Sequence, residues 1–531
     1  NMGPVDGYAF FNGVNNNSVM SPMVEINPKN YMSGGKANSM LVSAYVDFEI
    51  IKGLNFRTQY SGYTQNNRRG EYAGKYTKTN KGSKNARGST ENYKTHNYTI
   101  DNTLTYNGVF GDHAINATAL LSVFDQYNEY MQIVVQDLPY RSLWHNLGTG
   151  ATPIQYNTDL VESGILSYMG RVNYTFMDKY LFTFTGRYDG ASQLSETNRW
   201  AFFPSAAIGW RLSEESFIQD LGVFNNLKLR ASYGEVGNTD AISPYATQAN
   251  IYQTFYDFDG SPAYGYTINS LSNQGLVWER SKELNLGIDF SLSDIKLSGT
   301  IEYYKRNTVD LILDDKVPPS TGFSDVVNNV GEIQNDGIEL ALNSVNLSTD
   351  DFQWQTNLTF TSNNDKVVKL AGGITEDKGN RRFVGESVRA HFSYKFDGIW
   401  QLGEEADAAV FGQVPGQVKV RDLNGDNKIT ADDRMILGKE TPDWTAGLRN
   451  QFTYKNWDMS LFVYTRQGAM FSNAFLMGTM GDVSSEKQNH SSAMDIWSED
   501  NPSNTYYSHM TGPGLGHKNE AKGGNTRVAL S

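Results

Sequence analysis

The segment of this sequence whose residue types and spacing best suit a metal ion lies between residues 422 and 433. Asp422, Asn424 and Asp426 stand at alternate positions, the spacing with which calcium loops present side-chain oxygens to the ion. The carbonyl of Lys428 would supply a further oxygen, and Asp433 would supply a late carboxylate. The sequence therefore predicts a Ca²⁺ site with these five ligands.

A metal-free alternative stays open for the same segment. Asn427 stands where calcium loops usually carry glycine, although asparagine tolerates left-handed backbone better than most residues. Asp433 reaches less far than the usual glutamate, and residues 424–427 can form an Asx-stabilised turn without any ion. Repulsion among the crowded carboxylates favours a cation.

Catalytic patterns are not found elsewhere in the sequence. It contains no cysteine, no His-Glu-x-x-His zinc signature, no G-x-S-x-G elbow and no Walker A sequence. Adjacent carboxylates such as Glu214 and Glu215 point apart in an extended chain. We therefore expect a protein that is not an enzyme.

Composition narrows the class of protein further. Hydrophobic residues make up 39% of the 531 residues and aromatic residues 13%, with 31 tyrosines, which suit the interfacial belts of membrane barrels. No apolar run approaches the roughly 18 residues of a membrane helix. The net charge of −13 argues against nucleic acid as a partner. The first residues do not resemble a signal peptide, so we expect the sequence to be part of a longer protein.

The hydrophobic pattern has a period of two, as in β-strands. In residues 282–292, for example, Leu284, Leu286, Ile288 and Phe290 share one face, and polar residues such as Asp289 take the other. About fourteen such segments occur, many close to the roughly 9–11 residues with which a tilted strand crosses a bilayer. They lie near residues 40–50, 54–64, 97–107, 114–124, 166–176, 180–189, 202–213, 227–233, 282–292, 296–305, 336–344, 352–361, 444–454 and 457–465.

Short and long connections alternate between these segments, as in barrels with tight periplasmic turns and large extracellular loops. The long connections are residues 64–97, 124–166, 235–282, 305–336 and 362–444; a medium, amphipathic connection spans 213–226. We expect residues 1–39 to be an extracellular loop or partial strand, 40–465 to hold the barrel strands, and 466–531 to be extracellular and rich in loops. The basic segment 64–95 could contact lipopolysaccharide or an acidic partner, or be a solvated loop.

Charged residues and glycines recur within the strands. Arg171, Arg187 and Arg211 are expected on one polar face, where they could face a lumen or merely pair with carboxylates such as Asp189. The mid-strand glycines are expected at bends or where the backbone of a plug comes close. These are Gly170, Gly186 and Gly209.

A series of motifs follows a fixed order along the chain. The first are Ser-Tyr-Met-Gly-Arg-Val-Asn-Tyr (167–174), Asp-Lys-Tyr-Leu (178–181), Gly-Arg-Tyr-Asp-Gly-Ala-Ser (186–192) and Phe-Phe-Pro-Ser-Ala-Ala-Ile-Gly-Trp-Arg (202–211). Leu-Lys-Leu-Arg-Ala-Ser-Tyr-Gly (227–234), Val-Gly-Glu-Ile-Gln-Asn-Asp-Gly-Ile-Glu (330–339) and Asp-Leu-Asn-Gly-Asp (422–426) come later. This ordered set resembles SusC/RagA-type TonB-linked outer-membrane proteins over residues 90–470.

The resemblance implies an all-β fold: a large antiparallel transmembrane β-barrel of about 22 strands with a plugged lumen, of which this chain would supply about fourteen. It also implies a SusD-like surface lipoprotein over the mouth and TonB acting through an N-terminal region outside this sequence. The location would be the outer membrane of a Gram-negative, Bacteroidota-like bacterium, in contact with lipid bilayer and lipopolysaccharide. The family's plug, TonB box and closing strands are not found in the sequence.

Three functions are considered for this sequence. The predicted one is active import of a bulky nutrient, an oligosaccharide or a peptide, together with the SusD-like lipoprotein. An outer-membrane enzyme would need a catalytic constellation, and none is visible. A secreted or surface-attached β-rich protein that binds carbohydrate or mediates adhesion would also suit the calcium-like loop and the many tyrosines.

Overall fold

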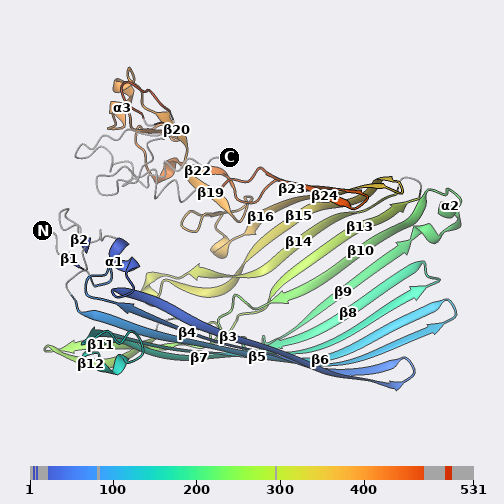
Figure 1. Cartoon of the computed structure of the whole chain (residues 1–531), viewed down its shortest axis with the longest axis horizontal. Helices are drawn as coiled ribbons and strands as arrows, with labels where there is room; N and C mark the ends of the chain where they lie inside the picture. Colours follow the sequence, from blue (N-terminus) through green and yellow to red (C-terminus); the bar gives the residue numbers. More distant parts are fainter. Residues whose placement is uncertain are drawn as a thin grey trace.

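The computed structural model describes residues 4–5, 8–9, 22–80, 84–268, 270–293, 296–471, 495 and 497–504. Fourteen strands form one antiparallel sheet in the order β24-β23-β16-β15-β14-β13-β10-β9-β8-β7-β6-β5-β4-β3 (Figure 1). Each strand of this wall pairs with its neighbours along the chain, and β3 and β24 are its edges. This confirms the predicted antiparallel architecture and its strand number.

The strands of the wall are β3 (Tyr31–Ile51), β4 (Leu54–Ala73), β5 (Ala86–Phe110), β6 (His113–Leu138), β7 (Thr152–Phe176), β8 (Tyr180–Ala191), β9 (Trp200–Arg211), β10 (Phe224–Asn238), β13 (Glu279–Leu292), β14 (Leu297–Lys316), β15 (Asp325–Ser348), β16 (Phe352–Lys369), β23 (Trp444–Tyr454) and β24 (Trp457–Gln467). Short strands pair outside it: β1 (Pro4–Val5) with β2 (Tyr8–Ala9), β11 (Ile251–Phe258) with β12 (Ser261–Ile268), β17 (Glu376–Asp377) with β18 (Arg382–Phe383), β19 (Ala390–Tyr394) with β22 (Arg434–Lys439), and β20 (Phe396–Ile399) with β21 (Val418–Val420).

The part of the chain that the structure describes contains few helices, and all are short. They are α1 (Pro22–Ile26), α2 (Ser216–Gln219), α3 (Glu405–Val410) and the 3₁₀ turns η1 (Leu147–Thr149), η2 (Leu212–Glu214), η3 (Pro319–Thr321), η4 (Ala371–Gly373) and η5 (Ala431–Asp433). Among the described residues, none of these helices has the length and apolar character needed to cross a membrane.

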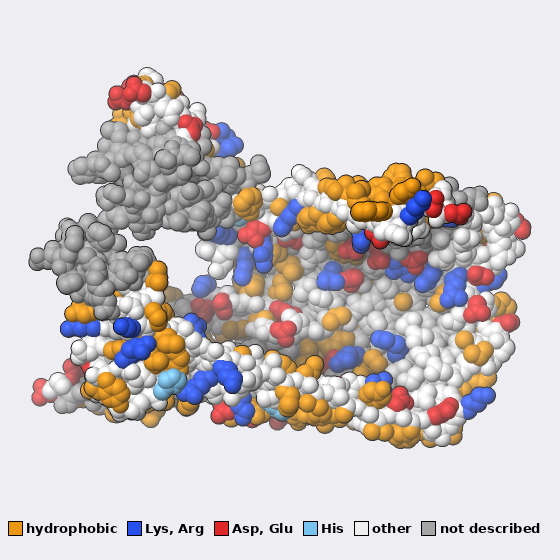
Figure 2. All heavy atoms as spheres, in the orientation of Figure 1, with side chains coloured by type: hydrophobic (Ala, Val, Ile, Leu, Met, Phe, Trp, Pro, Cys, Tyr) orange, Lys and Arg blue, Asp and Glu red, His pale blue; other side chains and the backbone are white. Residues whose placement is uncertain are grey.

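The two faces of the wall differ in chemistry, as the period of two predicts. Leu284, Leu286 and Ile288 lie on one face of β13 and are 38–43% exposed. Asp289 lies on the other face, where it pairs with Arg230 of the neighbouring strand. Figure 2 shows that the wall curves round a hollow in which acidic and basic side chains gather. The charged face is therefore the inner face, and the apolar face is the outer one.

Tight turns and long connections fall at opposite ends of the wall. Residues 52–53, 111–112, 177–179 and 455–456 make tight turns at one end, on the right in Figure 1. Residues 74–85, 139–151, 239–278 and 370–443 lie at the other end. We call these the short-turn end and the long-loop end. The predicted alternation of short and long connections is confirmed.

Several predicted loops are shorter than expected, because the strands are longer. β4 reaches Ala73 and β5 begins at Ala86, so much of the predicted loop 64–97 is paired strand. The same holds for predicted loops 124–166 and 305–336, since β4 to β7, β14 and β15 are 20 to 26 residues long. Sequence alternation ends where the outer face turns polar, whereas backbone pairing continues beyond that point. Those loop assignments were wrong for this reason.

The ends of the wall also bear on the predicted divisions of the chain. β3 begins at Tyr31, within the segment 1–39 in which a partial strand was expected. β24 ends at Gln467, and most of the predicted loop-rich segment 466–531 lies outside the described residues.

An aromatic belt surrounds the outer face near the short-turn end. Its rings contact one another across strands, as between Tyr180 and Trp210, whose centroids are 6.3 Å apart, and between Trp354 and Phe452, at 5.7 Å. Aromatic side chains collect at the boundary between water and lipid because one end of the ring tolerates each phase. The belt consists of Phe48, Phe56, His113, Tyr174, Phe176, Tyr180, Phe182, Trp210, Phe352, Trp354 and Phe452.

A charge on the outer face should impair assembly of the wall. Ile288→Arg would place a guanidinium in lipid at a cost of about 2–4 kcal/mol near the bilayer midplane. We expect less folded full-length protein in the membrane fraction, measured by heat-dependent mobility in gels. Ser232→Arg puts the same side chain on the inner face of the neighbouring strand, and Asp289→Asn removes an inner charge. Assembly as poor in these two variants as in Ile288→Arg would contradict the assignment of faces.

Candidate functional site

The inner face of the wall carries a charged network at β10, β13 and β14. The Arg230 guanidinium donates to both carboxylate oxygens of Asp289 at 2.9 and 3.0 Å and to Glu302 Oε1 at 2.7 Å. Asn285 donates to the other oxygen of Glu302 at 3.2 Å. Gly287 is the cross-strand partner of Arg230, and a Cβ there would lie 2.8 Å from the guanidinium carbon. The glycine thus leaves room for the arginine to lie across the strand.

The arginines predicted on one polar face do lie on the inner face. Arg187 binds Asp189 at 2.8 Å and donates to Ser167 at 2.9 Å. Arg171 donates to Thr185 at 3.1 Å, and Arg211 donates to a backbone carbonyl at 3.0 Å. Two roles were open for these arginines: facing the lumen freely or pairing with lumenal carboxylates. Arg187 has the second role, since it pairs with Asp189.

The prediction for the mid-strand glycines needs correction. Gly170 and Gly186 are cross-strand partners on the outer face, and a Cβ on Gly186 would lie 2.9 Å from the Phe202 ring. Gly186 leaves room for the outward Phe202 ring, and a plug inside the lumen could not reach either glycine. Of the three glycines, only Gly209 lies on the inner face. A Cβ at this position would lie 3.4 Å from the Lys228 side chain and 3.5 Å from the Leu181 side chain.

A hairpin that sequence analysis missed projects from the long-loop end. β11 and β12 pair over their whole length and carry exposed aromatic rings on both faces. Phe255, Tyr264 and Tyr266 are 62–72% exposed on one face. Asp259 and Gly260 join the strands with φ of 53° and 78°, the left-handed pair of a tight hairpin turn. That Asp-Gly pair, flanked by alternating aromatic residues, was the available signal inside the predicted loop 235–282.

The predicted calcium loop forms a turn stabilised by its own side chains. Asp422 accepts from the N–H groups of Gly425 and Asn427 at 2.7 and 2.8 Å. Asn424 accepts from Asp426 N–H at 2.9 Å, and Asp426 accepts from Lys428 N–H at 2.8 Å. Asn427 has a φ of 62°, the left-handed conformation expected of it. The segment lies in the long connection between β16 and β23, as predicted.

Asp433 holds the two ends of this loop together from a fully buried position. One of its oxygens accepts from Leu423 N–H at 3.0 Å and the other from Thr430 N–H at 2.7 Å. Across the described part of the chain, no three acidic or histidine side chains are grouped closely enough to hold a metal ion. The three predicted carboxylate ligands, Asp422, Asp426 and Asp433, are thus near one another in sequence but are not grouped in space in this arrangement.

The folded arrangement defines the wall of a transmembrane β-barrel with a charged inner face and an apolar, aromatic-belted outer face. The family model described as TonB dependent receptor-like, beta-barrel matches residues 4–505. The chain belongs to this family.

Named relatives agree with this assignment. The chain is 35% identical to TonB-dependent receptor P3 of Formosa agariphila over 83% of this chain and 46% of that protein. It is 34% identical to TonB-dependent receptor SusC of Bacteroides thetaiotaomicron over 56% of this chain and 30% of that protein. The chain thus spans about half or less of the curated relatives it matches. The predicted SusC/RagA-type identity is confirmed.

A solved structure shows the same fold. The RagAB peptide importer in its open-open state aligns with a TM-score of 0.78 at 21% identity, over 93% of this chain and 54% of that chain. The two curated relatives are receptors by name, not enzymes.

Asp433 should govern the order of the loop that contains it. Asp433→Ala leaves the N–H groups of Leu423 and Thr430 without their acceptor, which costs about 1–3 kcal/mol. We expect faster amide hydrogen exchange across residues 420–437. Asp432→Ala, at the exposed neighbouring position, should leave exchange unchanged. Equal exchange in both variants would show that Asp433 does not hold the loop.

The same carboxylate gives the loop a defined pH dependence. Burial alone would raise the pKa of Asp433, but the N–H donors of Thr430 and Leu423 outweigh it and hold the pKa below its usual value. The stabilisation is therefore complete above the unfolded-state pKa of about 4 and is lost as pH falls through the lower folded-state pKa. Exchange in the loop, corrected for intrinsic rates, should stay constant from about pH 8 to about pH 5 and accelerate only in more acidic buffer.

Proposed function

We propose that the full-length protein imports a bulky nutrient, an oligosaccharide or a peptide, across the outer membrane of a Gram-negative bacterium. The observation that carries this proposal is the wall itself, apolar outside and charged inside, in a chain of the TonB-dependent receptor family. In such a protein the short-turn end faces the periplasm and the long-loop end faces the exterior. The outer face then contacts the bilayer and lipopolysaccharide.

The charged network supports transport of a polar solute. Arg230 and Lys228 balance the charges of Asp289 and Glu302, and the side chains of these four residues remain 22–30% exposed, so they present polar groups along the wall. A polar solute that passes such a wall replaces its hydrogen bonds to water with hydrogen bonds to the wall. When it leaves, the charged groups of the wall remain paired with one another. RagAB is named a peptide importer, which supports a peptide as one of the two substrate classes.

Energy coupling is the direct test of import. Cells that carry the full-length protein should take up labelled oligosaccharide or peptide only while the proton gradient across the inner membrane is intact. A protonophore should abolish uptake without changing binding at the cell surface. Uptake that persists after the gradient collapses would indicate a passive pore, and binding without any uptake would favour the adhesive alternative.

We further propose that a SusD-like lipoprotein closes the long-loop end and that the β11–β12 hairpin is part of its docking surface. An isolated two-stranded hairpin is marginally stable in water. This one exposes Phe255, Tyr264 and Tyr266 on one face and Tyr256 and Phe258 on the other, all 52–72% exposed. Exposed aromatic clusters of this kind supply much of the free energy of protein–protein interfaces.

Replacing these rings should release the partner. In the double variant Phe255→Ser and Tyr264→Ser, we expect recovery of the co-purifying lipoprotein to fall at least about tenfold, the effect of roughly 1.4 kcal/mol of lost binding. Tyr140→Ser removes a ring that is 54% exposed elsewhere at the long-loop end and should have little effect. Wild-type recovery with the double variant would remove the hairpin from the interface.

Calcium binding by residues 422–433 is a separate proposal, since the carboxylates would have to turn toward one another to hold the ion. We expect millimolar Ca²⁺ to slow hydrogen exchange in this loop of the full-length protein. Asp422→Asn keeps one side-chain oxygen for the Gly425 N–H but removes a charge, so it should weaken the calcium effect about tenfold. A loop unaffected by Ca²⁺ would leave the Asx-stabilised turn as the whole explanation.

A further inference from the structure

The connection between β9 and β10 differs from the tight turns at the short-turn end. η2 and α2 occupy it, and the chain returns to the wall only at Phe224. We call residues 212–223 the helical turn. It corresponds to the amphipathic connection that the sequence placed at 213–226, and Figure 1 shows it projecting at the short-turn end.

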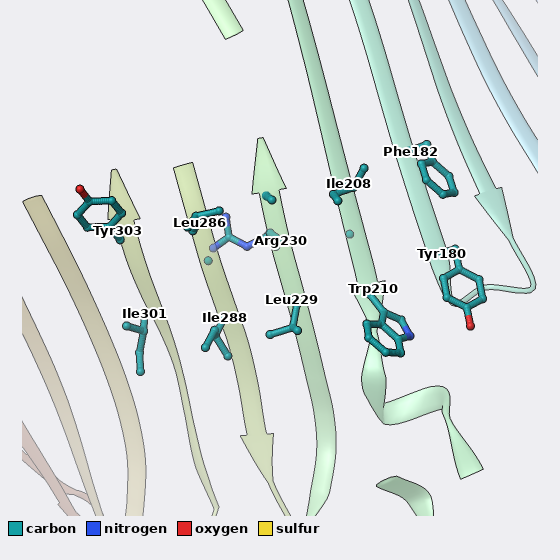
Figure 3. Close-up of a pocket in the computed structure, with 13 residues that line it drawn as sticks. Tyr180, Phe182, Ile208, Trp210, Leu229, Arg230, Leu286, Ile288, Ile301 and Tyr303 are labelled. Atoms are coloured by element: carbon teal, nitrogen blue, oxygen red, sulfur yellow. The ribbon is translucent and has the colours of Figure 1, made fainter. Parts of the chain in front are cut away.

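Glu215 determines on which side of the wall the helical turn lies. Its Oε1 accepts from the Tyr180 hydroxyl at 2.8 Å and from Trp210 Nε1 at 3.2 Å. Its Oε2 accepts from Lys179 Nζ at 3.1 Å. Tyr180 and Trp210 both belong to the aromatic belt of the outer face, and Figure 3 shows their rings on neighbouring strands. The carboxylate therefore ties the helical turn to the lipid side of the wall and not beneath the lumen.

Beyond this attachment, the helical turn exposes apolar side chains. Phe217, Leu221 and Val223 are 57%, 60% and 46% exposed. Polar residues such as Glu214 and Asp220 lie between them in sequence, which gives the segment a mixed apolar and charged surface. Such a surface suits the boundary between phospholipid headgroups and acyl chains, where the apolar groups leave water and the charged groups keep it.

The outer face next to the helical turn continues the same apolar surface. A hollow of about 750 Å³ lies there, lined by Trp210, Leu229, Ile288 and Ile301 among others (Figure 3). Trp210 and Tyr180 line this hollow and also bind Glu215, so the hollow, the belt and the helical turn are continuous. Since the belt and the outer face already contact lipid, the occupant that fits this surface is the periplasmic leaflet of the bilayer.

We propose that the helical turn is a membrane anchor, which Glu215 holds against the aromatic belt while Phe217, Leu221 and Val223 enter the periplasmic leaflet of glycerophospholipids. The hollow beside it receives acyl chains of the same leaflet. The inference rests on the membrane placement in the proposed function, but it does not depend on import or on a substrate.

A spin label at the helical turn would test the anchor. The 531 residues contain no cysteine, so Phe217→Cys introduces a single attachment site in this part of the protein. In full-length protein reconstituted in phospholipid nanodiscs, the label should collide with lipid-soluble oxygen more than with a water-soluble nickel chelate. Asp350→Cys, in the turn between β15 and β16, is the matched control at the same end. We expect a several-fold higher ratio of oxygen to nickel accessibility at position 217.

Glu215→Ala, combined with Phe217→Cys, tests the attachment. Without the hydrogen bonds to Tyr180, Trp210 and Lys179, the ratio at position 217 should fall toward that of the control. Equal ratios at positions 217 and 350 would overturn the anchor, and so would a label shielded from both reagents, which would indicate protein contact. A transport-inactive protein with the expected ratios would leave the anchor standing. Lipid exposure at position 350 would instead contradict the membrane placement.

Discussion

The structure depends above all on pairing every backbone N–H and C=O group of the wall. Inside a bilayer no water can satisfy these groups, and each unpaired one costs several kcal/mol. The antiparallel ladder from β3 to β24 meets this requirement without interruption, strand by strand in chain order. β3 and β24 are the edges of this ladder, and among the described residues no further strand pairs with either of them. Each strand of the ladder runs antiparallel to the strand before it, so every second connection lies at the same end of the wall. The tight turns and the long connections are separated for this reason.

Once the ladder is fixed, the period of two divides the chemistry between two surfaces. In β13, Ile288 contacts the lipid side, while the next residue, Asp289, receives Arg230 on the lumen side. A shift by one residue would bring the charge into lipid and the isoleucine into water, so the register is strongly determined. The glycines illustrate the same division. Gly287 makes room for a lumenal guanidinium, and Gly186 makes room for an outward Phe202 ring. A small residue thus makes room on the inner or on the outer face, depending on which face its position in the strand belongs to.

Sequence patterns predicted the features that the period of two controls, and they failed for features that do not depend on that period. The membrane-crossing parts of the strands and the lipid-facing set at Leu284, Leu286 and Ile288 could be predicted, because alternation has a direct physical cause there. The extensions of β4 to β7 could not, since regular alternation ends there, and they are held by backbone pairing and by a cluster in which Tyr72 and Val135 pack with Leu147 of the following loop. The partners of Arg230 could not be predicted either, because Glu302 lies two strands away and cross-strand register does not appear in sequence spacing. The Asx turn at residues 424–427 was predictable because its hydrogen bond is local.

The wall and its connections differ in how strongly the ladder constrains their side chains. On the inner face the charged groups of β10, β13 and β14 are matched to one another, so the charge of this part of the wall is balanced. Selectivity requires groups that gain a partner only when the correct ligand arrives, and such groups are better placed where the ladder does not constrain them. The β11–β12 hairpin meets that condition, with Tyr264 and Tyr266 more than two-thirds exposed beyond the wall. Substitutions at the long-loop end are therefore less constrained, while changes within the wall must preserve register, parity and charge balance together.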